Sequence, residues 1–236
     1  MDKKLVDIYN YIEESSNDFN NHFDTIVSSS SVLDFIKDIK SRTQVYLFSG
    51  LIRDYFLNKN DGIRDIDLII EDDLAVEQIY SEFDIYKNSF GGYKIIIDNT
   101  TIDLWAIKNT WGLNYGQLNL SFGYLNHLPE TTFFNFSSIL FSLNNKEFIV
   151  GKNFLEFLNN KKLDVVLEAN PFPELCIVNT FYYSEKFNLK LSKNLKEYII
   201  KNYNKYHTKI NDAQINHFQN ILYTEDDMLR RVNELV

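Results

Sequence analysis

A β-type run, a Ser-Gly pair and a helical segment follow one another from residue 45, and this order constrains the fold more than any other feature. Val45-Tyr46-Leu47-Phe48 has the composition of a strand, and residues 51–57 return to helical periodicity after Ser49-Gly50. Glycine allows close backbone approach, and a helix opening at such a turn directs free N–H groups at an anion. The order predicts a mixed α/β unit with an anion site, suited to a triphosphate, at this turn.

Three residues at the turn are candidate nucleotide ligands. Ser49 offers a hydroxyl, Gly50 offers its backbone, and Arg53 lies one helical turn further on. Arg53 has a second interpretation, in which it pairs with Asp54 or another acid and supports the scaffold. Both interpretations of Arg53 are kept as alternatives.

A pair of carboxylates follows on the next predicted strand, residues 64–70. Asp65 and Asp67 are two positions apart, so a strand presents both on one face. Like charges on one face repel, and a divalent cation relieves the repulsion. Mg²⁺ suits one or two carboxylates together with substrate phosphates. The spacing therefore predicts a magnesium site.

A third acid, Asp103, lies in another predicted strand, residues 101–107. If that strand pairs beside Asp65 and Asp67, three acids converge and two Mg²⁺ ions can stabilise the attacking and leaving oxygens of a phosphoryl displacement. Asp98 is the competing third acid, but we expect it at a turn that faces solvent.

This ordered set resembles the head of the polymerase-β nucleotidyltransferase superfamily, in the branch of poly(A) polymerases and tRNA CCA-adding enzymes. In that branch a Gly-Gly or Gly-Ser turn precedes a helix with Arg-Asp, and Asp-x-Asp follows on the next strand. Here the matching segments are Ser49-Gly50, Arg53-Asp54 and Asp65-Ile66-Asp67. Looser similarity covers residues 134–138 and part of a neck helix from residue 173, where Asn179 occupies a position often held by Arg.

The resemblance implies a mixed sheet flanked by helices, two Mg²⁺ ions, and transfer of a nucleoside monophosphate from a nucleoside triphosphate with release of pyrophosphate. In this scheme Asp65 and Asp67 hold both ions, and Asp103 holds the catalytic ion and helps to activate the acceptor hydroxyl. ATP or dATP is the donor that the resemblance favours.

The whole chain is predicted to be α+β, with two parts. Residues 1–155 form a mixed-sheet nucleotidyltransferase head with N-terminal and flanking helices, and residues 156–236 form a small all-helical, neck-like domain. Ser31, Ser192 and Thr224 are candidate helix N-caps, and Asn99-Thr100 reads as a hairpin turn.

The net charge of −9 is unevenly distributed along the chain. The first part is acidic, which disfavours a phosphate-coated interface there. Residues 186–209 carry seven lysines and one glutamate with tyrosines between them, which suits single-stranded nucleic acid. The alternative is that these lysines simply form a solvated helix face with no binding role. The candidate contacts are Lys186, Lys190, Lys193, Lys201 and Lys205.

The single cysteine and the lengths of the apolar runs indicate the cellular compartment of the protein. The one cysteine, Cys176, cannot form an internal disulfide, and no apolar run approaches the ~18–20 residues of a membrane span. We therefore expect a soluble protein in the reducing cytoplasm, with no membrane partner. The four histidines show no metal-ligand spacing. Trp105, Trp111 and Tyr115 are the nearest candidates for stacking on a base.

Three functions compete at this stage. The first is Mg²⁺-dependent nucleotidyl transfer to a 3′-OH of a nucleic acid or a self-made oligonucleotide, and the compact size is compatible with a prokaryotic regulatory or defence role. The second transfers AMP to a hydroxyl of a partner protein, which a mainly acidic cleft rim would favour. The third is an inactive nucleotide-binding scaffold, against which the three acids argue.

Overall fold

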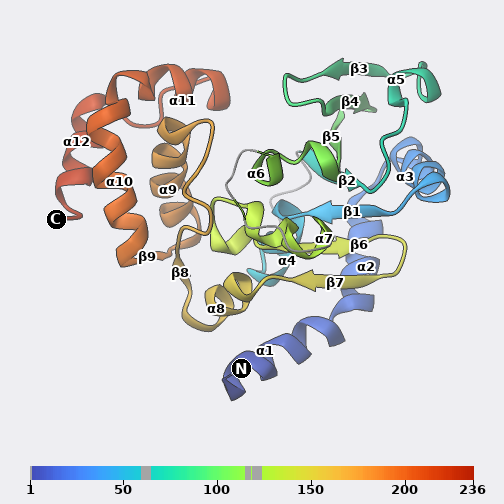
Figure 1. Cartoon of the computed structure of the whole chain (residues 1–236), viewed down its shortest axis with the longest axis horizontal. Helices are drawn as coiled ribbons and strands as arrows, with labels where there is room; N and C mark the ends of the chain where they lie inside the picture. Colours follow the sequence, from blue (N-terminus) through green and yellow to red (C-terminus); the bar gives the residue numbers. More distant parts are fainter. Residues whose placement is uncertain (1, 60–64, 115–117, 119–123) are drawn as a thin grey trace.

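A seven-stranded sheet forms the centre of one lobe, and helices form the other (Figure 1). The computed structural model describes residues 2–59, 65–114, 118 and 124–236. The predicted strand residue Arg64 and the stacking candidate Tyr115 lie outside the described residues. In the order β3-β4-β5-β2-β1-β6-β7, only β2 and β5 pair in parallel. The strands are β1 (Val45–Phe48), β2 (Asp65–Ile70), β3 (Asp84–Lys87), β4 (Tyr93–Ile97), β5 (Thr100–Ala106), β6 (Ile139–Ser142) and β7 (Glu147–Val150).

The two faces of the sheet pack against different helices. Alternate residues such as Ile66, Leu68, Ile102 and Leu104 enter the main core, because side chains in a strand alternate between faces. The helices of this face supply residues to the same core. They are α1 (Lys3–Glu14), α2 (Ser16–Ile26), α3 (Ser30–Arg42), α4 (Gly50–Phe56) and α8 (Lys152–Asn160).

The opposite face carries a smaller apolar cluster that includes Tyr46, Ile69 and Leu140. Short helical segments cover part of it, and the acids Asp65 and Asp67 lie on the same side as Ile69. The short segments of this lobe are α5 (Val76–Ile79), α6 (Trp111–Asn114), α7 (Tyr124–His127) and the 3-10 turns η1 (Ile107–Asn109), η2 (Leu128–Thr131) and η3 (Asn135–Ser137).

The second lobe is helical apart from one pair of two-residue strands. Its long helix begins at Pro173, as the sequence predicts. Ser192 and Thr224 accept hydrogen bonds from Leu195 N and Asp227 N and are confirmed as N-caps. The elements are β8 (Lys162–Leu163), α9 (Pro173–Phe187), β9 (Lys190–Leu191), α10 (Lys193–Tyr206), η4 (His207–Lys209), α11 (Ile210–Phe218) and α12 (Glu225–Asn233).

Two details of the predicted elements need correction. The N-cap of α3 is Ser29 rather than Ser31, because the Ser29 hydroxyl accepts the hydrogen bond of Val32 N. The helix expected over residues 73–80 is only the four-residue α5. The β4–β5 hairpin is confirmed, but its turn is Asp98-Asn99 rather than the predicted Asn99-Thr100, because Thr100 already pairs with Ile97. Asp98 and Asn99 both have positive φ, as a tight two-residue hairpin turn requires.

The predicted α+β class, with a mixed-sheet head and a helical part, is confirmed. The division at residue 155 stays a prediction, and that residue lies inside α8. One apolar core runs from the head into α9 and α10. Within the described residues, no helix combines the length and the apolar character needed to cross a bilayer.

Candidate active site

Two of the predicted acids are direct neighbours across the parallel strands. In the register of β2 and β5, Asp67 lies opposite Asp103, whereas Asp65 lies opposite Thr101. All three acids lie on the sheet face opposite the main core, and the apolar residues that alternate with them point into that core. The structure therefore brings Asp67 and Asp103 side by side and places Asp65 at the start of the same strand face.

Burial and nearby charges perturb the carboxyl groups of Asp67 and Asp103. The pKa of Asp67 is raised to about 7, first by burial and then by the charges of Asp103 and Asp65, while the Arg53 charge opposes the shift. The pKa of Asp103 is raised mainly by burial, and Lys94, its register neighbour on β4, lowers it. A raised pKa means that the folded protein disfavours the charged carboxylates when nothing compensates them.

A hard divalent cation fits this donor set. Among the described residues, no three Asp, Glu, His or Cys side chains are arranged to hold one metal ion together. The fit therefore rests on the Asp67–Asp103 pair, whose repulsion a cation relieves, with substrate phosphates completing the shell as Mg²⁺ prefers. Two ions held by all three acids stay a prediction.

The Ser-Gly turn borders the same site. Ser49 joins β1 to α4 with φ 52° and ψ −82°, a backbone region that an L-residue adopts only under strain. A Cβ built on Gly50 would meet the Asp67 Oδ2 atom at 3.9 Å and no other atom within 4 Å. Packing within the protein does not fill the space beside Gly50, and this space opens next to Asp67.

Arg53 is held by its own lobe and by α9. Its Nε donates to Asp54 Oδ1 at 2.7 Å, and the residue is only 9% exposed. The guanidinium carbon lies 4.9, 5.2 and 4.9 Å from the ring centroids of Phe136, Tyr183 and Phe187. In this structure Arg53 therefore supports the scaffold, as the second interpretation proposed, and its contact with a phosphate stays a prediction.

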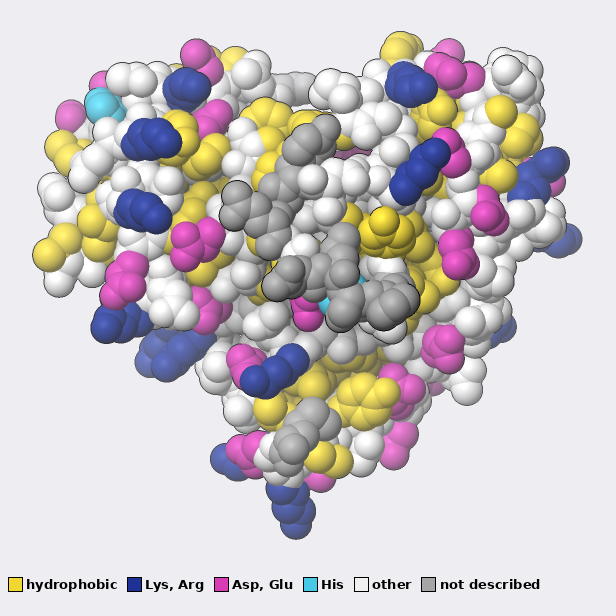
Figure 2. Space-filling model, viewed as in Figure 1, with side chains coloured by type: hydrophobic (Ala, Val, Ile, Leu, Met, Phe, Trp, Pro, Cys, Tyr) yellow, Lys and Arg dark blue, Asp and Glu magenta, His cyan; other side chains and the backbone are white. Residues whose placement is uncertain are grey.

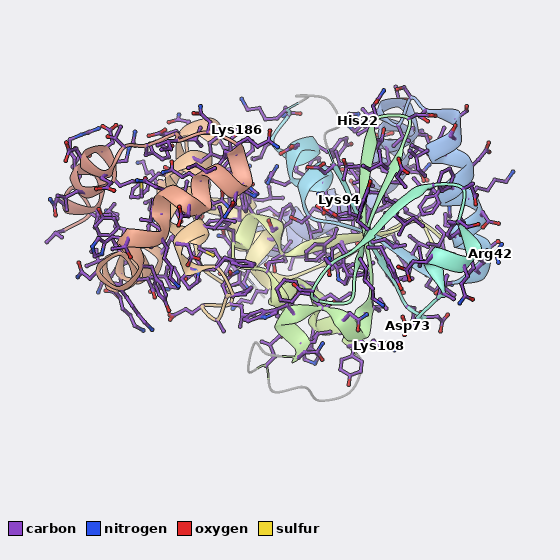
Figure 3. All side chains as sticks on the ribbon, turned by 90° about the horizontal axis from the view of Figure 1, so that it is seen from above. His22, Arg42, Asp73, Lys94, Lys108 and Lys186 are labelled. Atoms are coloured by element: carbon purple, nitrogen blue, oxygen red, sulfur yellow. The ribbon has the colours of Figure 1, made fainter. Side chains whose placement is uncertain are left out.

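The acids and the turn line one cleft of about 760 Å³ between the two lobes. The sheet lobe supplies Gly50, Asp67 and Asp103, and α9 supplies Asn179 and Lys186. Figure 3 shows Lys186 on the helical lobe and Lys94 on the sheet lobe. The volume is of the size that takes a nucleotide.

Sequence reasoning missed several residues that line this cleft. Tyr182 comes from α9, and so does Asn179, which the resemblance noted only as a position often held by Arg. Among the described residues, the buried Asn179 Oδ1 has no hydrogen-bond partner. Phe90 and Phe172 line the cleft from two loops. Pro173 and the loose neck similarity indicated the helix α9 in the sequence but not that it borders the cleft, and a lone phenylalanine in a loop carries no signal of its position.

The remaining candidates are distributed as follows. Trp105 and Trp111 line the cleft, although the Trp105 Nε1–H donates to Thr110 Oγ1. Of the five candidate lysines only Lys186 lines it, and Lys193 pairs with Glu197 at 3.6 Å. Figure 2 shows Lys and Arg side chains of this face mixed with Asp and Glu rather than gathered in one patch. Asp98 sits at the β4–β5 turn, as predicted, and accepts a hydrogen bond from Ser29.

Several solved structures share the fold of this chain. A CCA-adding enzyme in complex with ATP aligns with a TM-score of 0.61 and 13% identity, covering 88% of this chain and 52% of that one. A tRNA nucleotidyltransferase complexed with a primer tRNA and an incoming ATP analog gives 0.58 and 17%, covering 83% and 58%. A tRNA-processing enzyme with CTP gives 0.57 and 16%, covering 84% and 56%.

The chain has the fold of these tRNA nucleotidyltransferases. The resemblance predicted from the sequence is thereby confirmed at the level of the fold. The chain spans about half the length of the structures that it matches. No protein-family model matches it, and no curated protein matches it in sequence.

Proposed function

We propose that the protein is a magnesium-dependent nucleotidyltransferase that transfers a nucleoside monophosphate from ATP or dATP to a 3′-OH of a nucleic acid or oligonucleotide. One observation carries the proposal: the Asp67–Asp103 pair lines a cleft that reaches the Ser-Gly turn. The shared fold supports it, because the solved neighbours include complexes with ATP and with CTP.

The reaction joins the acceptor oxygen to the α-phosphorus of the donor. The bond between the α-phosphorus and the bridging oxygen to the β-phosphorus breaks, and pyrophosphate leaves with the electron pair. The acceptor hydroxyl loses its proton in the same displacement. A bound Mg²⁺ supplies charge stabilisation for the oxygens that gain negative charge.

The chain's own residues divide this work between two neighbouring parts of the sheet lobe, the strand acids and the Ser-Gly turn. Asp65, Asp67 and Asp103 would hold the metal ions, and Asp103 would orient the acceptor hydroxyl. Ser49 and Gly50 would seat the triphosphate, in the space that packing leaves open beside Gly50. Arg53 would act on the nucleotide only by leaving Asp54 and its aromatic neighbours, so we assign it chiefly to holding α9.

A transfer assay tests the proposal directly. Purified protein is incubated with Mg²⁺ and α-labelled ATP, dATP and other triphosphates, with and without a single-stranded primer. We expect label in an extended oligonucleotide and a loss of at least 100-fold for Asp67→Asn or Asp103→Asn. Asp98→Asn is the matched control, because Asp98 carries the same charge at an exposed turn. Activity that persists in both site variants would contradict the proposal.

Gly50→Ala provides a second, independent test. A Cβ at residue 50 meets no protein atom closer than 3.9 Å, so the variant is expected to fold with unchanged thermal stability. The added methyl occupies the space proposed for the triphosphate, so ATP affinity measured by calorimetry should fall about tenfold or more. Unchanged ATP affinity would show that the triphosphate does not bind at this turn.

A protein acceptor is the second candidate, and the charge of the cleft favours it. The described residues that line the cleft include four carboxylates, Asp54, Asp65, Asp67 and Asp103, against the cationic side chains of Arg53 and Lys186. While no Mg²⁺ is bound, such a lining favours an acceptor without phosphates. In the same assay this reaction places the label on a protein band and needs no primer. No label at all would favour the scaffold alternative.

The cellular setting forms part of the same hypothesis. Cys176 is a buried free thiol, and burial raises its pKa, so it stays protonated and unreactive. We propose a reducing, cytoplasmic location on this basis. A prokaryotic regulatory or defence role stays a prediction.

A further inference from the structure

Two exposed phenylalanines meet across the entrance of the cleft. Phe90 lies in the turn between β3 and β4, and Phe172 directly precedes α9. Their ring centroids are 6.3 Å apart at an interplanar angle of 85°, an edge-to-face contact between segments far apart in the sequence. Figure 1 shows the β3–β4 turn pointing toward the helical lobe.

The exposure of these rings is not explained by packing. Phe90 is 40% exposed and Phe172 is 48% exposed, although both line the cleft that holds the acids. An edge-to-face pair covers one face of one ring and one edge of the other, so much of each ring stays open. Most other described phenylalanines are buried in the main core.

Both rings are presented by loops that are fixed locally. The Asn88 Oδ1 atom accepts hydrogen bonds from Phe90 N and Gly92 N, each at 2.9 Å. The Asn109 side chain also donates to Gly91 O at 3.1 Å, which ties this turn to η1, the 3-10 turn that follows β5. On the other side, Asn170 Oδ1 accepts from Phe172 N at 2.9 Å. A preorganised aromatic surface loses little conformational entropy when it binds a planar group.

We infer that Phe90 and Phe172 form a stacking site for an unpaired nucleobase at the entrance of the cleft. A base has a planar π-face that stacks on an open phenylalanine ring without sequence-specific hydrogen bonds. The inference deepens the proposed function and rests on it for the nucleic-acid chemistry. The base has two sources, the donor nucleotide or the 3′-terminal residue of the acceptor, and the test separates them.

The test measures binding rather than turnover, so that it stands apart from the transfer assay. Wild type, Phe90→Leu, Phe172→Leu and the double variant are titrated with ATP and with ribose 5-triphosphate, which lacks a base. They are also titrated with a trinucleotide and with its analogue that is abasic at the 3′ end. Leucine keeps the apolar volume and removes the ring face.

We expect the leucine variants to lose about tenfold in affinity for one of the two base-carrying ligands and to leave its base-less analogue unchanged. A loss confined to ATP assigns the site to the donor base, and a loss confined to the trinucleotide assigns it to the acceptor. Tryptophan at either position should restore the affinity, because it restores a stacking face.

Tyr86→Leu is the matched control, because Tyr86 is an exposed aromatic residue on β3 of the same hairpin that does not line the cleft. Unchanged affinity for both base-carrying ligands, or an equal loss for the base-less analogues, would overturn the inference. Base-dependent losses in a protein that shows no transfer would uphold the stacking site and refute only the proposed function.

Discussion

At the scale of single residues, two substitutions at Ser49 distinguish the strain of its backbone from the role of its hydroxyl. A positive φ with ψ near −80° is unfavourable for any residue that has a Cβ. Ser49→Gly should therefore raise the free energy of unfolding by about 0.5–1 kcal/mol. Ser49→Ala keeps the strain and removes only the hydroxyl.

The two Ser49 variants should differ in stability. If the hydroxyl binds the triphosphate, both variants lose ATP affinity, but only the glycine variant gains stability in urea unfolding. Equal stabilities would show that Ser49 is not strained, and full ATP affinity in Ser49→Ala would remove the hydroxyl from the site.

The half-buried carboxyl of Asp67 predicts that stability depends on pH with an unusual sign. Its pKa is about 7 in the folded protein and about 3.9 in an unfolded chain, so the folded state binds more protons between these values. Its contribution therefore destabilises the protein increasingly as pH rises from about 4 to about 7. Asp67→Asn should be more stable than wild type at pH 8 by on the order of 1–3 kcal/mol and close to it at pH 4.

Urea unfolding in EDTA at both pH values checks this sign. Asp98 is the control of opposite sign, because hydrogen bonds from Ser31 and Ser29 hold its pKa below the usual value. Asp98→Asn should lose stability at pH 8. A less stable Asp67→Asn at pH 8 would show that the carboxylate is compensated within the protein itself.

Residue-scale prediction from the sequence succeeded where strand periodicity decides the outcome. The two-residue spacing of Asp65 and Asp67 fixed their shared face, and the parallel register then placed Asp103 beside Asp67. Periodicity carries no information about partners across the lobes. The rings of Tyr183 and Phe187 beside the Arg53 guanidinium come from α9. The sequence does not show this contact, so both interpretations of Arg53 remained open.

At the scale of elements, α10 and the β9 strand before it carry most of the lysine stretch. Lys190, Lys193, Lys201 and Lys205 are exposed, so they are available to phosphates. If they bind single-stranded nucleic acid, replacing all four by Gln should flatten the slope of log affinity against log salt by up to about 3. Fluorescence anisotropy with a labelled oligonucleotide across a salt series measures this slope.

A control with the same change in net charge distinguishes the effect of where the lysines lie from the effect of total charge on binding. Lys3, Lys4, Lys37 and Lys152 are equally exposed and belong to helices of the head, so the corresponding Gln variant changes the net charge by the same amount. The control should retain the wild-type slope. Equal slopes in both variants would leave α10 as a solvated helix face.

Helix ends show where element-scale prediction stops. Pro173, Ser192 and Thr224 were located correctly, because proline at a first turn and hydroxyl caps act on backbone groups a few residues away. At α3 the four consecutive serines 28–31 offered the same chemistry, and the extended backbone of Ser29 with its hydrogen bond from Val32 N makes it the cap. Such a choice depends on how the preceding loop packs.

At the scale of the whole molecule, the two lobes share one apolar core. Phe136 of the head lies 5.1 Å from Tyr183 and 6.1 Å from Phe187, between ring centroids, and the Arg53 guanidinium lies among the same rings. Burial of apolar surface across a boundary makes the two sides unfold together, because exposing one side exposes the other. The lobes are therefore expected to form one cooperative unit.

A buried residue far from the fluorescent reporters tests this cooperativity. Both tryptophans, Trp105 and Trp111, belong to the head, whereas Ile199 is fully buried in α10. Ile199→Ala should cost about 2–5 kcal/mol. In a cooperative molecule the urea midpoint followed by tryptophan fluorescence falls as far as the midpoint followed by circular dichroism at 222 nm. Ile215→Ala, at an exposed position of α11, should move neither. If Ile199→Ala shifts only the dichroism midpoint, the helical lobe unfolds by itself, and the cleft lies between two independently folding units.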